Sequence, residues 1–181
     1  ADLCSLKEKQ EQITAVALYD ATLAQIASQA GIDCLLVGDT LGQMFQGHNT
    51  TVPVTVDDII YHTKAVARGN RGAFIIGDMP FMSCVDVVDA CRAAQAIMQA
   101  GAQMVKCEGD SALVPLVQRL SEQGVPVCVH LGLRPQSIHM EGRYRVQGRD
   151  LAAADQLLND ALALEKAGAK CCVLECVPSS L

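Results

Sequence analysis

The feature that most constrains this chain is a short apolar run that ends in an ionisable residue and recurs along the sequence. Residues 34–39 (CLLVGD) are the clearest example, because four apolar residues are followed at once by Gly38 and Asp39. Later runs of the same kind end in acids or an imidazole, at Asp78, Glu108, His130 and Glu175. Runs this short are typical of buried parallel strands. Ionisable groups at the ends of successive strands form the active site of a (β/α) barrel, so the pattern predicts both a fold and a site.

Segments with helical periodicity separate these runs. The expected strands are residues 13–19, 34–37, 73–77, 104–107, 126–129 and 170–175. The expected helices are residues 21–30, 56–68, 85–100, 111–123 and 151–167. Each of these helices ends in a turn that contains Gly, which readily adopts the left-handed conformation of a helix end. Strict alternation of strands and helices implies a parallel sheet and an α/β fold.

The length limits how much of a barrel this chain can form. Its 181 residues are 50% hydrophobic, which is enough to bury one core. The pattern supplies six strands, whereas a closed TIM-type barrel has eight. We therefore expect residues 1–181 to be a single (β/α)8 TIM-type barrel domain that is truncated at the C-terminus and supplies about six strands. An open doubly wound sheet is the alternative.

Composition excludes several classes of function. The net charge is -6, no basic stretch occurs and only 3% of residues are aromatic, so nucleic-acid binding is not expected. The nine cysteines form no C-x-x-C motif and lie mostly inside apolar runs, which favours reduced thiols in an intracellular protein over a disulfide framework or a zinc cluster. No apolar run approaches the roughly 18 residues needed to span a bilayer. The start of the chain lacks the apolar region of a signal peptide, so we expect a cytoplasmic protein with no membrane partner.

Three acids are candidate metal ligands. Asp39, Asp78 and Glu108 carry hard oxygen ligands at the ends of the second, third and fourth expected strands, and such carboxylates suit Mg²⁺. Each acid taken alone is equally compatible with a helix cap or a surface ion pair. Lys106 lies two residues before Glu108, so both side chains face the same way on a strand. Lys106 is therefore a candidate ligand for a substrate carboxylate, with a salt bridge to Asp78 or Glu108 as the alternative.

Two further residues are candidates for proton transfer. A neutral His130 is able to donate a hydrogen bond to a developing enolate oxygen, although a lone His at that position would more often be a core residue. Glu175 suits a general base, with a cap or an ion pair as the alternative. The P-loop motif fails, because residues 42–47 are followed by His48 in place of Lys. Acids, a base and a Lys around a metal indicate enolisation of a 2-oxo acid.

Motifs in the same order along the whole chain resemble those of the ketopantoate hydroxymethyltransferase family, the first committed enzymes of pantothenate synthesis. The motifs are ALYD (17–20), VGDTLG (37–42), VPVT (52–55), HTKAV (62–66), DMPF (78–81), VKCEG (105–109), HLGLRPQS (130–137), YRVQGR (144–149) and LECVP (174–178).

The resemblance implies a Mg²⁺-dependent (β/α)8 barrel that forms large homo-oligomers, commonly decamers. It implies transfer of a hydroxymethyl group from 5,10-methylenetetrahydrofolate to 2-oxoisovalerate (3-methyl-2-oxobutanoate), which gives ketopantoate for pantothenate and coenzyme A synthesis. The implied roles are Mg²⁺ coordination by Asp39 and Asp78 with Glu108 in or near the shell, binding of the oxo acid by Asp39, Thr40, Asp78 and Lys106, proton acceptance by Glu175, and a place for His130 beside the enolate.

The sequence departs from the family pattern at several positions. Thr40 stands where Ser is usual, Val129 stands where Gly is usual, and residues 141–144 (EGRY) replace a Gly-Gly-Tyr arrangement. The chain also ends soon after Glu175, whereas the family continues through two further strands and a Gly-rich segment near the folate site. Two other functions therefore stay open. One is a related Mg²⁺-dependent 2-oxo-acid enzyme of the phosphoenolpyruvate mutase and isocitrate lyase group, and the other is a non-catalytic, oligomer-forming remnant.

Overall fold

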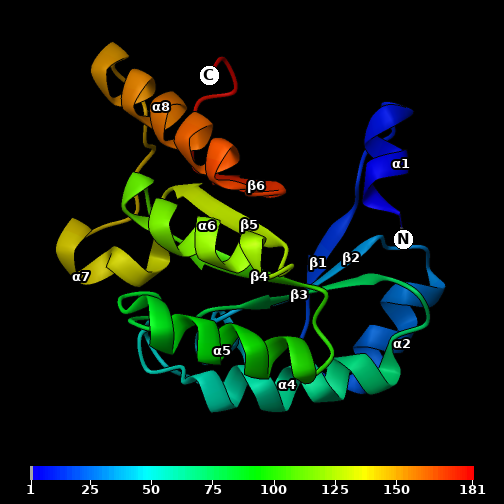
Figure 1. Ribbon diagram of the computed structural model, residues 1–181. Coiled ribbons are helices and arrows are strands. Elements are labelled where there is room, and N and C mark those ends of the chain that lie inside the picture. Colours follow the sequence, from blue (N-terminus) through cyan, green and yellow to red (C-terminus); the bar gives the residue numbers. More distant parts are fainter. Residues whose placement is uncertain (1) are drawn as a thin grey trace.

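The computed structural model describes residues 2–181 and contains one six-stranded parallel sheet (Figure 1). The strands are β1 (Ala15–Ala17), β2 (Cys34–Val37), β3 (Phe74–Asp78), β4 (Met104–Glu108), β5 (Val127–Gly132) and β6 (Cys171–Glu175). Each strand pairs in parallel with the next one in the chain. A doubly wound sheet reverses its strand order at a switch point, and this sheet does not. The strands therefore form part of a barrel wall, and the open doubly wound alternative is wrong.

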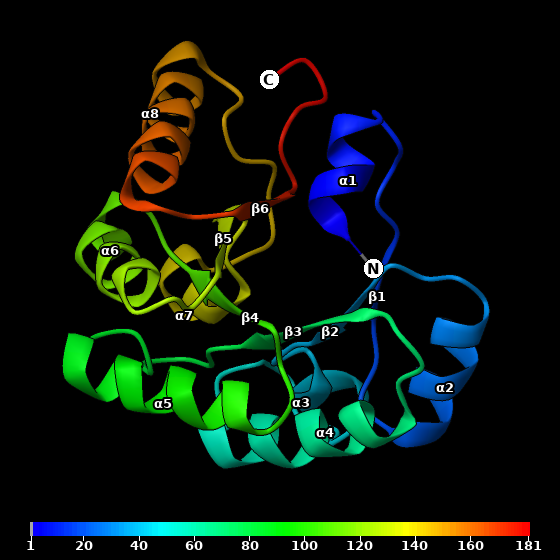
Figure 2. The same cartoon turned by 45° about the vertical axis from the view of Figure 1, so that its right-hand side comes forward.

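Helices alternate with the strands along the chain. They are α1 (Leu3–Glu8), α2 (Ala21–Gln29), α3 (Leu41–Met44), α4 (Val56–Gly69), α5 (Val87–Gln99), α6 (Val114–Glu122), α7 (Ile138–Glu141) and α8 (Leu151–Ala167), with short 3-10 helices η1 (Ser111–Leu113) and η2 (Pro135–Ser137). Figure 1 shows α4, α5, α6 and α8 along one face of the curved sheet. Figure 2 shows α1 on the other side of the sheet.

Local chemistry explains where the helices begin. The Asp86 side chain accepts hydrogen bonds from the backbone N–H groups of Val88 and Asp89, so α5 begins at Val87 and not at residue 85 as expected. A capping box between Thr55 and Asp58 begins α4 at the expected residue. The expected helix 111–123 is divided into η1 and α6.

The two faces of the sheet differ in character. One face packs against the helices through a large apolar core that includes Leu35, Ile75, Val105, Val127 and Ile97. The other face carries a small apolar cluster of Cys34, Ile76, Met104 and Cys128, against which Leu3 of α1 packs. Side chains alternate between faces along a strand, so the ionisable residues that follow this small cluster face the barrel interior. All nine cysteines within residues 2–181 are free thiols.

The helices of the described chain are short for a lipid bilayer. Within residues 2–181, none combines the length and apolar character that crossing a membrane requires.

Candidate active site

The carboxyl ends of the parallel strands bring the ionisable residues to one edge of the sheet. The strand register pairs Asp78 with Lys106, Glu108 with His130, and Gly132 with Glu175. Asp39 and Thr40 follow directly after β2 and Gly38. The side chains that the sequence singled out therefore come from five neighbouring strands and lie at the edge where barrel enzymes place their active sites.

A buried cluster of one Lys and two Asp residues forms the first half of the site. Lys106 Nζ lies 2.7 Å from Asp78 Oδ2, and the two side chains are 6% and 0% exposed. The backbone N–H of Asp39 donates to the same Oδ2 atom over 3.1 Å. Asp78 Oδ1 is buried and has no hydrogen-bond partner among the described residues. The salt bridge named as the alternative for Lys106 is thus present, and it lies inside the site.

The cluster holds more negative than positive charge. Burial and the neighbouring charge of Asp78 raise the pKa of Asp39 to about 7, although Lys106 and a hydrogen bond from Gln136 oppose the rise. Burial alone would lower the pKa of Lys106, but the charges of Asp78 and Asp39 outweigh burial and raise it. Lys106 therefore stays charged, while Asp39 needs either a proton or a further cation beside it.

His130 lies between two glutamates and forms the second half of the site. Its Nδ1 is 3.4 Å from Glu108 Oε2, and its Nε2 is 3.2 Å from Glu175 Oε2. Neither ring nitrogen has a well-directed hydrogen bond within residues 2–181. Glu108 is buried, with 2% of its side chain exposed, whereas the Glu175 side chain is 41% exposed. The exposed carboxylate is thus the one that can reach a substrate.

Gly132 allows β5 to lie close to the backbone of Glu175 at the end of β6. Its φ is +89°, and a Cβ atom there would lie 2.2 Å from the Glu175 carbonyl oxygen. The same carbonyl oxygen accepts a hydrogen bond from Leu133 N over 2.8 Å. Only Gly fits this combination of left-handed backbone and close contact.

Gln136 is a site residue that the sequence reasoning did not select. Its backbone N–H donates to Glu108 Oε1 over 2.8 Å. Its side-chain Nε2 donates to Asp39 Oδ2 over 2.9 Å and to the Met79 carbonyl oxygen over 3.1 Å. The motif HLGLRPQS contains Gln136, but nothing in that pattern indicates which polar residue turns toward the carboxylates.

Thr40 and Tyr19 lie beside the acidic cluster. Thr40 is exposed at the start of α3, and its side chain makes no cap hydrogen bond. The Tyr19 hydroxyl bonds to the Thr40 side chain, and burial of the ring raises the pKa of Tyr19. Tyr19 was part of a motif in the sequence but was not selected as a site residue.

The assignment of Asp39, Asp78 and Glu108 as metal ligands stays a prediction. Within residues 2–181, no group of three or more His, Cys, Asp and Glu residues is arranged to hold a metal ion. Glu108 is turned aside, because Gln136 N binds its Oε1 and His130 faces its Oε2. Asp39 and Asp78 remain as a pair whose unpartnered oxygen suits a cation.

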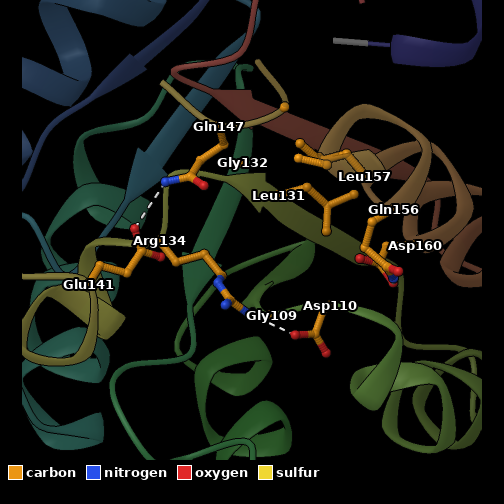
Figure 3. A pocket seen from close by; sticks show the side chains of 12 residues that line it. Gly109, Asp110, Leu131, Gly132, Arg134, Glu141, Gln147, Gln156, Leu157 and Asp160 are labelled. Atoms are coloured by element: carbon orange, nitrogen blue, oxygen red, sulfur yellow. Dashed lines mark hydrogen bonds and ion pairs between the residues drawn. The ribbon is translucent and has the colours of Figure 1, made fainter. Parts of the chain in front are cut away.

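A cavity of about 230 Å³ lies behind β5, away from this cluster. Leu131 lines it and points to the opposite face of β5 from His130. Figure 3 shows Arg134 and Asp110 joined on one side of the cavity and Gln147 and Glu141 joined on another. The cavity therefore belongs to the space between the barrel wall and α8, and not to the carboxylate site.

Comparison with known sequences identifies relatives along the whole chain. A sequence model of the family described as ketopantoate hydroxymethyltransferase matches residues 1–181. The 3-methyl-2-oxobutanoate hydroxymethyltransferase of Marinobacter nauticus is 53% identical over 175 residues, which cover 97% of this chain and 66% of that protein. The enzyme of the same name from Photorhabdus laumondii is 51% identical over 180 residues, which cover 99% and 68%. The chain thus spans about two thirds of the length of these relatives.

Solved structures confirm the fold. Phosphonopyruvate hydrolase in complex with oxalate and Mg²⁺ superposes with a TM-score of 0.73 and 14% identity, covering 96% of this chain and 61% of that one. A 2,3-dimethylmalate lyase, described as a member of the phosphoenolpyruvate mutase/isocitrate lyase superfamily, superposes with a TM-score of 0.68 and 16% identity, covering 95% and 60%. The chain therefore supplies part of the barrel that these enzymes share.

Proposed function

We propose a reaction for this chain from its family, because it belongs to the ketopantoate hydroxymethyltransferase family. In this reaction the site removes a proton from a carbon atom of a 2-oxo acid and adds a one-carbon unit to the same carbon. The acid is 3-methyl-2-oxobutanoate, and the donor is 5,10-methylenetetrahydrofolate. A bond forms between C3 of the acid and the methylene carbon, while C3 loses its proton to a base. Water supplies the hydroxyl oxygen, tetrahydrofolate leaves, and the product is ketopantoate (2-dehydropantoate), a precursor of pantothenate and coenzyme A.

The acidic pair fits Mg²⁺. Asp78 Oδ1 is buried without a partner in the described chain, and burial together with the neighbouring charge of Asp78 raises the pKa of Asp39 to about 7. Mg²⁺ binds through one or two carboxylates and leaves the other positions to water and substrate oxygens. When bound, the ion supplies Lewis-acid polarisation of the keto group. Asp39 and Asp78 would hold it, with Glu108 close by.

Lys106 and Thr40 would orient the substrate. Lys106 carries a positive charge inside the barrel next to Asp78, so it can pair with the carboxylate of the oxo acid. Thr40 is an exposed residue directly after Asp39, and its hydroxyl would be a further donor to the substrate. Orientation matters because the C–H bond at C3 must lie toward the base when the proton is transferred.

Glu175 would act as the base, with His130 as its partner. If Nδ1–H of His130 points to Glu108, the lone pair of Nε2 faces Glu175. A proton that Glu175 takes from C3 is then stabilised as an O–H···N hydrogen bond to Nε2. The single observation that carries the proposal is this exposed glutamate at the end of the row Glu108–His130–Glu175, which begins on β4 two residues after Lys106.

The experiment is proton NMR of 3-methyl-2-oxobutanoate in D₂O with Mg²⁺ and without folate. We expect the chain to exchange the C3 proton for deuterium. Glu175→Gln should slow the exchange at least 100-fold, at the low end of the range for loss of a general base, about 10²–10⁴. Glu165→Gln, at an exposed position of α8, is the matched control and should leave the rate unchanged. A folded sample that shows no Mg²⁺-dependent exchange would contradict the proposal.

The rest of the proposal concerns assembly and location. Residues 1–181 would belong to one (β/α)8 barrel domain in a cytoplasmic protein that forms a homo-oligomer, a decamer by resemblance to the family. Sedimentation velocity measures this directly, and a monomer at micromolar concentration would count against it.

A further inference from the structure

Gln136 follows β5 and makes hydrogen bonds to residues at the ends of three other strands. It lies in η2, on the loop between β5 and α7, and is half-buried. Its hydrogen bonds reach Asp39 after β2, Met79 after β3, and Glu108 at the end of β4. Arg134 holds the start of the same loop through an ion pair with Asp110 over 2.9 Å.

The chemistry of its partners fixes the orientation of the Gln136 amide. The Met79 carbonyl oxygen can only accept a hydrogen bond, and the Asp39 carboxylate when ionised also only accepts. Both N–H bonds of Nε2 are therefore used. A flipped amide would place its own oxygen against two acceptors, so the amide is locked in one of its two orientations.

This lock determines which carboxylate oxygens remain available. Gln136 occupies Asp39 Oδ2 and Glu108 Oε1. Lys106 and the Asp39 N–H occupy Asp78 Oδ2, which leaves Asp78 Oδ1 without a partner within residues 2–181. Asp39 and Asp78 thus each have their Oδ2 atom held by the protein, whereas Glu108 has Gln136 N at one oxygen and His130 at the other.

We propose that Gln136 is a positioning residue that fixes the rotamer of Asp39 and so preorganises the carboxylate pair for a divalent cation. The inference deepens the proposed function and rests on it. Partners of metal ligands act in this way, because a carboxylate that is already held in place loses less freedom when it binds the ion.

Gln147 offers a matched control. Its Nε2 also bridges a carboxylate and a carbonyl oxygen, Glu141 Oε2 over 3.0 Å and Arg145 O over 3.3 Å. It lies on the same connection between β5 and α8, but its partners are not the acids of the site. Gln147→Met thus removes an equivalent amide bridge, while Gln136→Met removes the one that holds Asp39.

The test is calorimetric titration of the chain with MgCl₂ alone, followed by the C3 exchange assay at low and saturating Mg²⁺. We expect Gln136→Met to raise the Mg²⁺ dissociation constant about tenfold, at the low end of the effect of losing a metal ligand's partner. The exchange rate should fall at low Mg²⁺ and recover at saturation, because the acids themselves are intact. Gln136→Asn, which withdraws the amide by one methylene, should behave in the same way. Gln147→Met should match the unmodified chain.

The outcomes separate this inference from the proposed function. Equal Mg²⁺ affinity of the folded Gln136→Met and Gln147→Met variants would overturn the role of Gln136. An exchange rate that does not recover at saturating Mg²⁺ would also overturn it. If the unmodified chain binds Mg²⁺ but exchanges no C3 proton, the proposed function fails, while the affinities still decide the role of Gln136. If it binds no Mg²⁺, both fail.

Discussion

Replacing Asp39 with Asn tests whether the site is built at a cost to stability. Asp39 is buried, with 3% of its surface exposed, and its pKa in the folded chain is about 7 against an ordinary value of 3.8. At about 1.36 kcal/mol for each pH unit, ionised Asp39 weakens folding by up to about 4 kcal/mol. An Asn side chain has nearly the same shape and no charge, so the substitution should remove most of this cost.

The sign of the effect depends on pH. Because the pKa of Asp39 is raised on folding, the folded chain holds the proton more tightly than the unfolded chain. The cost is absent below pH 3.8, grows as the pH rises, and is complete above about pH 7. We therefore expect Asp39→Asn to stabilise the metal-free chain at pH 8 and to have little effect at pH 4.

The assay is urea unfolding in EDTA at the two pH values, followed by circular dichroism. Asp155→Asn, at an exposed position in α8, is the control and should change stability little at either pH. The reasoning is refuted if Asp39→Asn is no more stable than the unmodified chain at pH 8. It is refuted equally if the gain is the same at both pH values, since a gain of that kind would come from packing.

Three further predictions concern the same site. Lys106→Met should lower the free energy of unfolding at pH 8 by about 3–5 kcal/mol, because it leaves the buried Asp78 without its cation. Urea unfolding measures this, and a loss below about 1 kcal/mol would indicate that Lys106 and Asp78 behave as an ordinary surface pair. Gly132→Ala should destabilise the chain more than Gly124→Ala, because both have positive φ but only Gly132 has backbone in the way of a Cβ atom; equal losses in urea would contradict this. Mg²⁺ at 100 times its dissociation constant should stabilise the unmodified chain by about 2.7 kcal/mol, and it should stabilise Asp39→Asn less; equal shifts in a thermal melt would exclude Asp39 as a ligand.

Most of the fold could be predicted because its signals are local. The expected helix 151–167 coincides with α8, since Asp150 accepts from Ala153 N at one end and Gly168 takes the left-handed conformation at the other. The expected strand 13–19 was too long. Only Ala15–Ala17 form β1, which pairs on one side only and is exposed at all three positions. The apolar run at this edge strand therefore overstated the length of the strand.

The site was predicted only as far as strand periodicity reaches. Positions two apart on a strand share a face, so the sequence alone places Lys106 and Glu108 together. Short helices inside the two long loops escaped this reasoning, because α3 and α7 are four residues each and have too few turns for a periodic pattern. Gln136 was not predicted as a site residue for the same reason, because it lies in η2, a helix of three residues.

The sequence by itself determined which side chains reach the carboxyl edge of the sheet, because the alternation of short apolar runs and helices predicts a parallel sheet, and the ends of its strands share one edge in a barrel wall and in a doubly wound sheet alike. Tertiary structure alone decided how those side chains share their atoms. Gln136 and Asp39 are 97 residues apart in the chain, yet a hydrogen bond joins them. A Gln that bridges two acceptors looks the same in sequence whether it holds Asp39 or, like Gln147, a Glu outside the site. The difference arises only when the sheet curves and brings the loop after β5 over the ends of β2 and β3. Burial there removes water from the hydrogen bonds and charges, so each interaction becomes stronger and each unpaired group more costly.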